Sequence, residues 1–258
     1  MTTPATIPAT DLRDDVVVVT GGSRGIGAGS ARRFAALGAR VVVSGRDEAA
    51  LGAVVASITA AGGLAVGIRA ECTDEREVEA LRAAAEQAFG PATILLAFAG
   101  GDGRPEPMAS LDASRWRAVI DTNLTAAYIT VRTFALGMIE RRRGSIVTMS
   151  STAGRQPGGA SVAYAAAKAG IVMLTRHLAA DLAPHGVRIN CIAPSAIETE
   201  RLAALMPEAA REQLGQSFPL GRLGSVDDVA DAALYLATQR SSWVTGVTID
   251  VTGGRVTA

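Results

Sequence analysis

A glycine-rich turn between a strand and a helix is the feature that most constrains the fold of this chain. Residues 16–19 are four consecutive valines. A continuous β-branched run of this kind is typical of a strand buried on both faces of a parallel sheet. The turn, TGGSRGIG at residues 20–27, follows directly, and a helical pattern then runs from about Gly25 to residue 37, where Gly38 ends it. The sequence therefore predicts a strand–turn–helix unit near the start of the chain.

The same alternation continues to the end of the chain. Further strands are predicted over residues 41–43, 64–68, 94–99, 145–149, 187–192 and 247–251, and further helices over residues 47–60, 74–89, 114–139, 163–182 and 226–238. Strands that alternate with helices predict right-handed βαβ units and an open parallel sheet. No composition shift marks a second domain. We expect a single α/β domain over residues 14–258, a doubly wound Rossmann fold with seven parallel strands and helices on both faces.

Three segments lie outside this alternation. Residues 1–13 are expected to form a flexible N-terminal tail. Residues 101–111 and 195–221 each follow a predicted strand, at the edge where ligands bind in such sheets. Within the second of them, residues 198–216 have the pattern of an amphipathic helix, so we expect residues 195–221 to act as a substrate lid, although packing on the body of the protein explains the same pattern.

Composition excludes several classes of protein. Twenty-five basic residues balance 25 acidic ones, which argues against a nucleic-acid binder that works by bulk charge. No apolar run approaches the roughly 18 residues of a membrane span, and the N-terminus lacks the features of a secretory signal. Cys72 and Cys191 are far apart in sequence and are interpreted as buried thiols rather than a disulfide or a metal site. We expect a cytoplasmic protein without a membrane, nucleic-acid or metal partner.

The glycine-rich turn has the properties of a pyrophosphate site. Its glycines allow close approach to the backbone, and the following helix offers free N–H groups and the positive end of its dipole. The spacing is G-x-x-x-G-x-G rather than G-x-G-x-x-G, and a purely structural turn is the alternative. The position after the first strand favours cofactor binding, and the predicted contacts are Gly21, Ser23, Arg24, Gly25, Ile26 and Gly27.

The end of the second predicted strand bears on the choice of dinucleotide. An NAD site requires an acid there to bind the ribose 2′-hydroxyl, whereas this strand ends in SGR, residues 44–46. Arg24 and Arg46 can instead form charge-assisted, bidentate bonds to a 2′-phosphate. The alternative is that both arginines are solvated and Asp47 is the NAD acid, but Asp47 is better explained as the N-cap of the next helix. This charge pattern favours NADP(H), with NAD as the less favoured cofactor.

A tyrosine and a lysine one helical turn apart are the candidate reacting pair. Tyr164 and Lys168, the only lysine in the chain, stand at i and i+4 and share one helix face. A free tyrosine has a pKa of about 10, and an ammonium group ~5 Å away at an effective dielectric constant of ~20 would lower this pKa by roughly two units. Such pairs also occur on helix surfaces without function. Here the pair predicts a group that exchanges protons near neutral pH.

Two further polar residues are candidates. Ser151 follows the fifth predicted strand, where its hydroxyl could polarise a carbonyl, or could simply cap a turn. Asn123, one of two asparagines, lies within a predicted helix, where asparagine is disfavoured. An internal hydrogen bond, a helix kink or a water held for proton relay would each account for Asn123.

Together these motifs resemble those of the short-chain dehydrogenase/reductases over about residues 14–254. The resemblance implies a catalytic tetrad in which Tyr164 is the acid/base, Lys168 binds the nicotinamide ribose and lowers the pKa of Tyr164, Ser151 orients the carbonyl and Asn123 holds a relay water. The cofactor residues that it implies beyond the turn are Glu71 and Cys72 at the adenine, Ala99 and Gly100 after the fourth strand, and Pro194, the backbone near Ile197, and Thr199 near the carboxamide.

The sequence also departs from the family pattern. Residues 97–100 are AFAG where the family usually has NNAG, so an asparagine that ties neighbouring strands is missing. Ser195 replaces a glycine, and Thr252 replaces an aspartate before two glycines. None of these departures removes a member of the tetrad.

The expected function is hydride transfer between NADP(H) and a small-molecule ketone or secondary alcohol, with a 3-oxoacyl thioester among the candidates. The alternative, a dinucleotide-binding sensor or scaffold without catalysis, is supported only by the altered NNAG motif. An acidic carrier protein would require a basic rim. Residues 141–143, RRR, could serve, although such a run is more often a solvated helix end that interacts favourably with the helix dipole. His185, at a second expected position, is only weakly charged at neutral pH. The resemblance also implies a homotetramer or homodimer.

Overall fold

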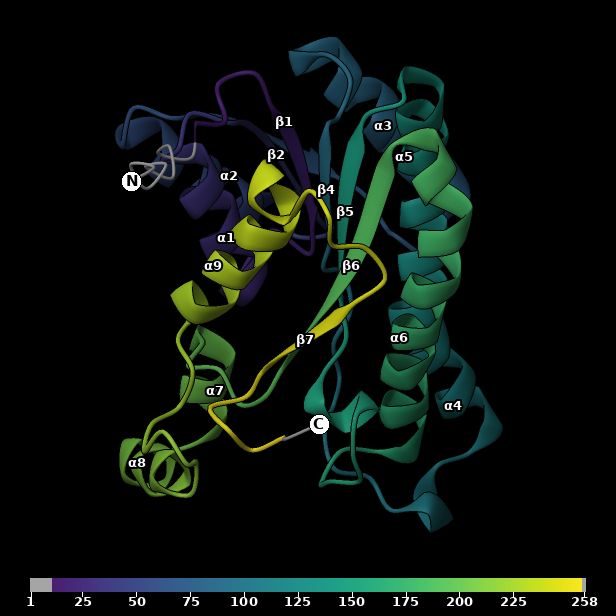
Figure 1. Cartoon of the computed structure of the whole chain (residues 1–258). Helices are drawn as coiled ribbons and strands as arrows, with labels where there is room; N and C mark the ends of the chain where they lie inside the picture. Colours follow the sequence, from purple (N-terminus) through teal and green to yellow (C-terminus); the bar gives the residue numbers. More distant parts are fainter. Residues whose placement is uncertain (1–10, 257–258) are drawn as a thin grey trace, which may run out of the picture.

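A computed structural model describes residues 11–256, and its seven strands form one parallel sheet (Figure 1). The strand order is β3-β2-β1-β4-β5-β6-β7. The predicted seven-stranded Rossmann fold is therefore confirmed. The strands are β1 (Val16–Thr20), β2 (Arg40–Gly45), β3 (Leu64–Arg69), β4 (Ile94–Ala97), β5 (Gly144–Met149), β6 (Val187–Pro194) and β7 (Thr248–Val251).

Three helices cover each face of the sheet (Figure 1). One face packs against α1 (Gly25–Ala35), α2 (Glu48–Ala60) and α9 (Val226–Ala237), and the other against α3 (Glu75–Phe89), α5 (Ala126–Arg141) and α6 (Val162–Leu182). Successive residues of a strand point to opposite faces, so β1 contributes to both cores: Val17 and Val19 to the first and Val18 to the second. This two-sided burial explains why the valine run lacks an apolar/polar alternation.

Side-chain caps begin several helices close to where the sequence predicts them. Asp47 accepts a hydrogen bond from the Ala50 N–H (3.0 Å), which confirms its prediction as the N-cap of α2. Asp74 caps α3 in the same way. These caps fix the direction in which each helix leaves the carboxyl edge of the sheet.

The single helix expected over residues 114–139 is interrupted in the structure. It consists of α4 (Ala113–Ile120), a π-helical turn η2 (Asp121–Thr125) and α5. The turn is centred on Asn123, whose side chain is fully buried. π-turns of this kind often occur at functional sites, and this one lies next to the candidate site described below.

The segment between β6 and α9 also differs from the prediction. Instead of one amphipathic helix over residues 198–216, it contains two short helices, α7 (Glu200–Leu205) and α8 (Glu208–Gln216), which meet at Pro207. A proline cannot donate the backbone hydrogen bond that a continuous helix requires. Leu205, one of the apolar residues of the predicted amphipathic helix, is 65% exposed. The remaining short elements are 3₁₀ turns: η1 (Met108–Ser110), η3 (Thr152–Gly154), η4 (Ala183–His185) and η5 (Gln239–Ser241).

The predicted N-terminal tail needs a correction at its inner end. Residues 1–10 of this tail lie outside the described residues. Leu12, in contrast, is buried in the first core and donates its backbone N–H to the Leu37 carbonyl oxygen (3.0 Å). The packed domain therefore includes residues that the sequence assigned to the tail.

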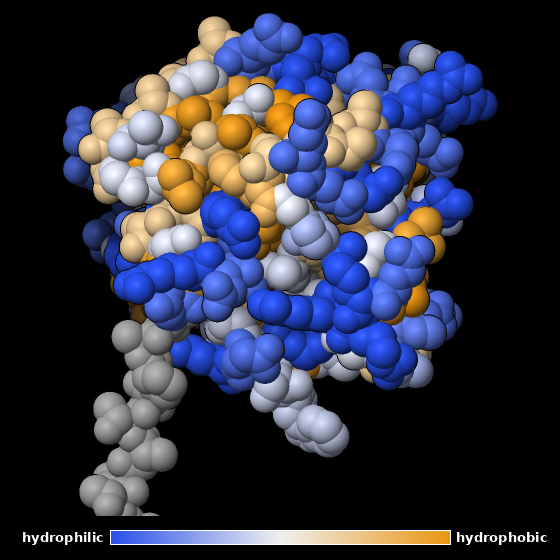
Figure 2. All heavy atoms as spheres, turned by 90° about the horizontal axis from the view of Figure 1, so that it is seen from above, coloured by the Kyte–Doolittle hydropathy of each residue, from blue (hydrophilic) through white to orange (hydrophobic). Residues whose placement is uncertain are grey.

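The two ends of the sheet differ in what they carry. The helices α7 and α8 lie at the carboxyl end, and Figure 2 views the molecule from the opposite end, where polar side chains surround a patch of apolar ones.

Residues 141–143 belong to this opposite end because they immediately precede β5. Their side chains are engaged there, by Ala92 and Pro184 carbonyl oxygens and by Asp15. Of the two alternatives for these arginines, a basic rim of the ligand cleft is therefore wrong for a cleft of the same subunit.

Candidate active site

A cleft of about 470 Å³ opens at the carboxyl ends of the strands. It includes the ends of β1 and β4, which are neighbours in the sheet although β2 and β3 come between them in sequence. Ligands bind at such switch points of doubly wound sheets. All the predicted cofactor and catalytic residues line this cleft except Asn123 and Ile197.

The glycine-rich turn is shaped by glycines that no other residue could replace without strain. Gly21 and Gly25 have positive φ angles of 67° and 51°. A Cβ atom on Gly27 would lie 2.2 Å from the Gly21 carbonyl oxygen. The turn is therefore compact, and it presents the N-terminus of α1 to the cleft.

A carboxylate from a distant part of the chain lies at this helix N-terminus. The Gly25 N–H donates a hydrogen bond to Glu200 Oε2 at 3.2 Å, across 175 positions of sequence. Thr199, the predicted cofactor residue before it, caps α7 by accepting from the Leu202 N–H (3.3 Å). The turn thus already binds an anionic oxygen, which is the property that a pyrophosphate site requires. Sequence analysis missed Glu200, because no local pattern relates it to the turn.

At the adenine end, the two arginines predicted to select NADP are each paired with an acid. Arg24 forms an ion pair with Asp47, and Arg46 lies 3.4 Å from Glu71. Both arginine side chains remain mostly exposed, at 67% and 71%. The Ala50 N–H and then the Arg24 guanidinium lower the pKa of Asp47. Asp47 is therefore an N-cap and an arginine partner at once, a combination that the sequence interpretation did not include.

Gly45 and Cys72 complete this end of the cleft. Gly45 ends β2 where an NAD-binding acid would stand, and a Cβ atom there would lie 3.2 Å from Ser23 Oγ. Cys72 is a buried free thiol whose pKa is raised by burial to about 11. It therefore contributes packing rather than thiolate chemistry.

At the other end, Tyr164 and Lys168 project from the first turns of α6 into the cleft. The Lys168 ammonium nitrogen lies 5.4 Å from the centre of the tyrosine ring and donates to the Met149 carbonyl oxygen (3.0 Å). The side chain is almost completely buried, and burial lowers the pKa of Lys168 to about 8. A buried cation with one fixed carbonyl partner leaves donors for a ligand in the cleft.

The phenol of Tyr164 differs from the prediction in the direction of its pKa shift. Burial raises the pKa of Tyr164 above its ordinary value, while the Ser151 hydroxyl and the positive charge of Arg201 lower it. Burial is the largest of these effects, so the predicted net lowering by Lys168 is wrong for this structure. A neutral phenol at pH 7 is suited to give a proton to a developing alkoxide.

Ser151 and Asn123 are held by different means. Ser151 lines the cleft and also caps η3, accepting from the Ala153 N–H at 3.2 Å. Asn123 Oδ1 accepts from the Gly101 N–H (3.0 Å), and its Nδ2 donates to the Gly101 and Val119 carbonyl oxygens (both 2.9 Å). The internal hydrogen bonds and the helix irregularity considered for Asn123 are therefore both present. A relay water at Asn123 stays a prediction.

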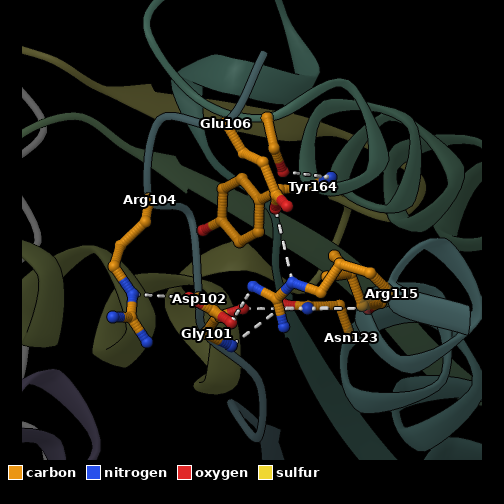
Figure 3. Close-up of polar contacts among 9 residues, drawn as sticks. Gly101, Asp102, Arg104, Glu106, Arg115, Asn123 and Tyr164 are labelled. Carbon is orange, nitrogen blue, oxygen red and sulfur yellow. Dashed lines mark hydrogen bonds and ion pairs between the residues drawn. The ribbon is translucent and has the colours of Figure 1, made fainter. Parts of the chain in front are cut away.

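A loop that the sequence left without structure packs against the tyrosine ring (Figure 3). In this 101–106 loop, Asp102 is paired with Arg104 (3.0 Å) and with Arg115, which also donates to Glu106 at 3.3 Å. A Cβ atom on Gly103 would lie 2.9 Å from an edge atom of the Tyr164 ring. The loop is thus fastened by Arg115 and by Asn123, and it holds the ring in place.

A second, smaller pocket adjoins the reacting end of the cleft. Its volume is about 320 Å³, and it shares Ser151, Tyr164 and Ser195 with the larger cleft. Gly158, Gly159 and Arg255 are among its other lining residues. The hydroxyl groups of Tyr164 and Ser151 therefore belong to residues that line both the larger cleft and the smaller pocket.

Ile197 and Phe98 lie where the sequence was compared with the family pattern. The Ile197 side chain is buried in the core, and Gly224 bonds to the backbone of its neighbours Ala196 and Glu198. The contact of the backbone near Ile197 with the carboxamide stays a prediction. Phe98, in place of the family asparagine, is buried at the cleft wall. Thr20 Oγ1 accepts from the Ala99 N–H (3.3 Å), which ties the ends of β1 and β4 without that asparagine.

Two general findings bear on the chemistry of the site. Within residues 11–256 no group of His, Cys, Asp or Glu side chains could hold a metal ion. None of the helices in this part of the chain is both long and apolar enough to span a bilayer.

Comparison with known proteins agrees with this geometry. Residues 15–210 match the family model of short chain dehydrogenases. The chain is 38% identical to 3-oxoacyl-[acyl-carrier-protein] reductase FabG of Chlamydia pneumoniae, over 92% of this chain and 95% of that one. It is 39% identical to cis-4-hydroxycyclohexanecarboxylate dehydrogenase of Sinomonas cyclohexanicum, over 93% and 95%.

A solved structure has the same fold over its full length. It is the NADPH-bound short chain oxidoreductase from Pseudomonas aeruginosa PAO1, described as containing an atypical catalytic center. The TM-score is 0.90, with 32% identity over 97% of this chain and all of that one. On the family match, the site and these relatives, the chain belongs to the short-chain dehydrogenase/reductase family, whose members are oxidoreductases of alcohols and ketones.

Proposed function

We propose that the protein is an NADP(H)-dependent oxidoreductase that interconverts a ketone and a secondary alcohol. The observation that carries the proposal is the placement of Tyr164, Lys168 and Ser151 in one cleft with the glycine-rich turn. The turn supplies backbone N–H groups for a pyrophosphate, and its Gly25 N–H already donates to a carboxylate. A nicotinamide dinucleotide therefore fits the donor set of the cleft, and when bound it supplies or accepts the hydride.

Each residue at the reacting end then has a defined role in reduction. Ser151 donates a hydrogen bond to the substrate carbonyl oxygen and polarises it. Tyr164 gives its phenolic proton to that oxygen as the carbonyl carbon gains a hydride, so that one alcohol forms. Lys168 offers its remaining N–H donors to the cofactor ribose and adds positive charge beside the phenol. In the oxidative direction the same proton returns to Tyr164.

The preference for NADP(H) is supported by charge at the adenine end. Arg24 and Arg46 are exposed, and Gly45 leaves no acid at the end of β2. Their ion pairs with Asp47 and Glu71 are exposed pairs, which contribute only about 0–1 kcal/mol. A 2′-phosphate can therefore recruit both guanidinium groups at little cost. The similar structure from Pseudomonas aeruginosa is described as NADPH-bound.

The proposal also covers the class of substrate, the location of the protein in the cell and its oligomeric state. A 3-oxoacyl thioester is one candidate substrate, since a relative is named for that reaction. We further propose a cytoplasmic homotetramer or homodimer built through α5 and α6, which carry exposed apolar side chains at Tyr128, Leu136, Val162 and Met173. Light scattering after size-exclusion chromatography measures this assembly, and a monomer would contradict it.

The decisive experiment is an initial-rate comparison of NADPH and NADH across a panel of ketones that includes a 3-oxoacyl thioester. We expect oxidation of NADPH with at least one carbonyl compound, and a kcat/KM that exceeds that for NADH by about tenfold or more, the effect of one charge-assisted contact. NADPH binding without oxidation by any compound would contradict catalysis and favour the sensor.

A further inference from the structure

Three acidic side chains near the reacting end are each paired with an arginine of the chain. In the 101–106 loop, Asp102 and Glu106 are both paired with Arg115. Asp250 is bound by Arg155 through two hydrogen bonds of 3.0 Å. Each of these carboxylates is thus neutralised by a partner from the chain itself.

Two arginines at the same end have no such partner. Among residues 11–256, no carboxylate lies within ion-pair distance of Arg201 or of Arg255. Arg201 lines the cofactor cleft at its reacting end, and its Nη1 lies 3.3 Å from the position of a Cβ atom on Gly101. Its positive charge also lowers the pKa of Tyr164, an effect smaller than that of burial, which raises this pKa.

Arg255 belongs to the smaller pocket. Its guanidinium carbon lies 5.1 Å from the centre of the Phe218 ring, a cation–π contact that fixes the plane of the group. Among the lining residues that the structure describes, Arg255 is the one charged side chain of this pocket. The remaining polar groups are hydroxyls and amides, including Ser151, Thr152 and Gln156.

Arg201 in the larger cleft and Arg255 in the smaller pocket are therefore two positive charges without an ion pair among residues 11–256, while Glu200 of the larger cleft accepts from the Gly25 N–H. A guanidinium group presents a planar fork of N–H donors that matches a carboxylate in a bidentate manner. Ligand pockets typically hold about 300–1,000 Å³, so a pocket of about 320 Å³ fits a small molecule. The complementary ligand is a small compound with an anionic group at a distance from its carbonyl.

We propose that the substrate is a small ketone, or the matching secondary alcohol, that carries a carboxylate bound by Arg255 and Arg201. Its carbonyl oxygen lies at Ser151 and Tyr164. The proposal rests on the proposed function, and it narrows the substrate class to oxo acids and hydroxy acids. Arg201 and Arg255 are then substrate-binding residues that determine specificity.

The test compares each oxo acid with its neutral, nearly isosteric amide. The probes are 4-oxocyclohexanecarboxylate and 4-oxopentanoate, each beside its amide, with NADPH in excess. We expect kcat/KM for the acids to exceed that for the amides by about 10- to 100-fold, as a hydrogen bond to a charged group predicts. In the double variant Arg201→Gln/Arg255→Gln this ratio falls to about one, while NADPH binding, followed by fluorescence, stays at the wild-type value.

The matched control is Arg76→Gln. Arg76 is exposed in the first turn of α3 and lines neither pocket, so the variant changes net charge without touching the site. We expect Arg76→Gln to keep the wild-type preference for the acids. Arg255→Lys should keep part of this preference, because a lysine retains the positive charge but lacks the forked N–H donors of a guanidinium group.

Two results would overturn the inference while leaving the proposed function intact: equal kcat/KM for acid and amide in the wild type, or an undiminished preference in the double variant. Loss of NADPH binding in the double variant would also overturn it, since the arginines would then serve the cofactor. A failure to reduce any ketone on the wider panel, neutral compounds included, would overturn the proposed function itself.

Discussion

The two ends of the cleft use arginine in different ways. At the adenine end, Arg24 and Arg46 are held by Asp47 and Glu71. At the reacting end, Arg201 and Arg255 have no carboxylate partner among residues 11–256. A phosphate that arrives at the first end must displace an acid, and the displaced pair is exposed and weak. An anion that arrives at the second end has no ion pair of these arginines to displace, so we expect the second end to discriminate more strongly by charge.

Burial separates the two ends further. The adenine-end arginines are mostly exposed, whereas Lys168 is buried beside Tyr164. Keeping an ammonium group out of water costs free energy, and this cost lowers the pKa of Lys168. The difference shows that the reacting end is preorganised at the expense of stability, and the adenine end is not.

The largest expected effect follows from removing the buried cation. Lys168→Met should lower kcat/KM for ketone reduction by about 10²- to 10⁴-fold, the range for a group that supports acid/base catalysis. Initial rates with NADPH measure the loss. A matched substitution at the other end, Arg46→Met, should leave kcat at saturating NADPH within a few-fold. Equal losses of kcat in Lys168→Met and Arg46→Met would contradict the claim that the reacting end supports the chemical step and the adenine end does not.

The same variant should be more stable than the wild type. The pKa of Lys168 falls from 10.5 to about 8, which corresponds to roughly 3 kcal/mol of unfavourable burial of the charge at pH 7. Because the folded pKa lies below the unfolded one, this cost is present in full below pH 8 and disappears as the pH rises toward 10.5.

The lost hydrogen bond to Met149 offsets part of the gain in Lys168→Met. We expect the free energy of unfolding to rise by about 1–2 kcal/mol at pH 7, and the gain to vanish by pH 10 or above. Thermal unfolding of the cofactor-free proteins at both pH values checks this. A variant that is less stable at pH 7 would contradict the assigned cost of burial.

Cofactor choice should depend on the adenine end alone. The double variant Arg24→Gln/Arg46→Gln should lose about 10- to 100-fold in kcat/KM for NADPH and little for NADH, because only NADPH carries the 2′-phosphate. The ratio of the two kcat/KM values is the measurement. The Arg201→Gln/Arg255→Gln variant serves as the comparison and should keep the wild-type ratio. A similar change of ratio in both double variants would contradict the separation.

The rate of reduction should depend on pH through Lys168. This lysine is charged below about pH 8 and becomes neutral above it. We expect kcat/KM for reduction to fall above pH 8, approaching tenfold per pH unit, as a single required protonated group predicts. The break should be absent in the residual activity of Lys168→Met. A wild-type profile that stays flat to pH 10 would count against the role of the ammonium group.

The smallest expected effect concerns the acid at the glycine-rich turn. Glu200 accepts from the Gly25 N–H, so it competes with the cofactor pyrophosphate. Glu200→Gln should tighten NADPH binding about two- to fivefold, since a charge at a helix N-terminus contributes about 0.3–1 kcal/mol. Fluorescence titration gives the dissociation constant. Glu208→Gln, at the start of α8, is the control that should leave it unchanged.

Local sequence patterns predicted the parts of the molecule that depend on neighbours in sequence. The valine run of β1, the cap at Asp47 and the i, i+4 pair of α6 are all visible in short windows, and all three are present in the structure. The π-turn at Asn123 was not visible as such, because its stabilising partner Gly101 lies 22 positions away. The break at Pro207 could have been predicted from the proline itself.

The missed parts of the site depend on contacts between distant residues. The Glu200 contact with Gly25 spans 175 positions, and the pairing of Asp102 with Arg115 requires the folded path of a loop. The pKa of Tyr164 was predicted from one neighbour, whereas burial by the 101–106 loop and the surrounding helices has the larger effect. The motif does not show that the Ile197 side chain packs in the core, because the partners of that side chain come from distant parts of the chain.

The most direct test of the account is a single-turnover measurement with Tyr164→Phe and excess ketone. The account predicts that this variant binds NADPH with the wild-type dissociation constant and oxidises it at least about 10²-fold more slowly, because the phenolic proton is the one delivered to the substrate oxygen. Oxidation of one equivalent of NADPH at the wild-type rate by Tyr164→Phe would contradict the account.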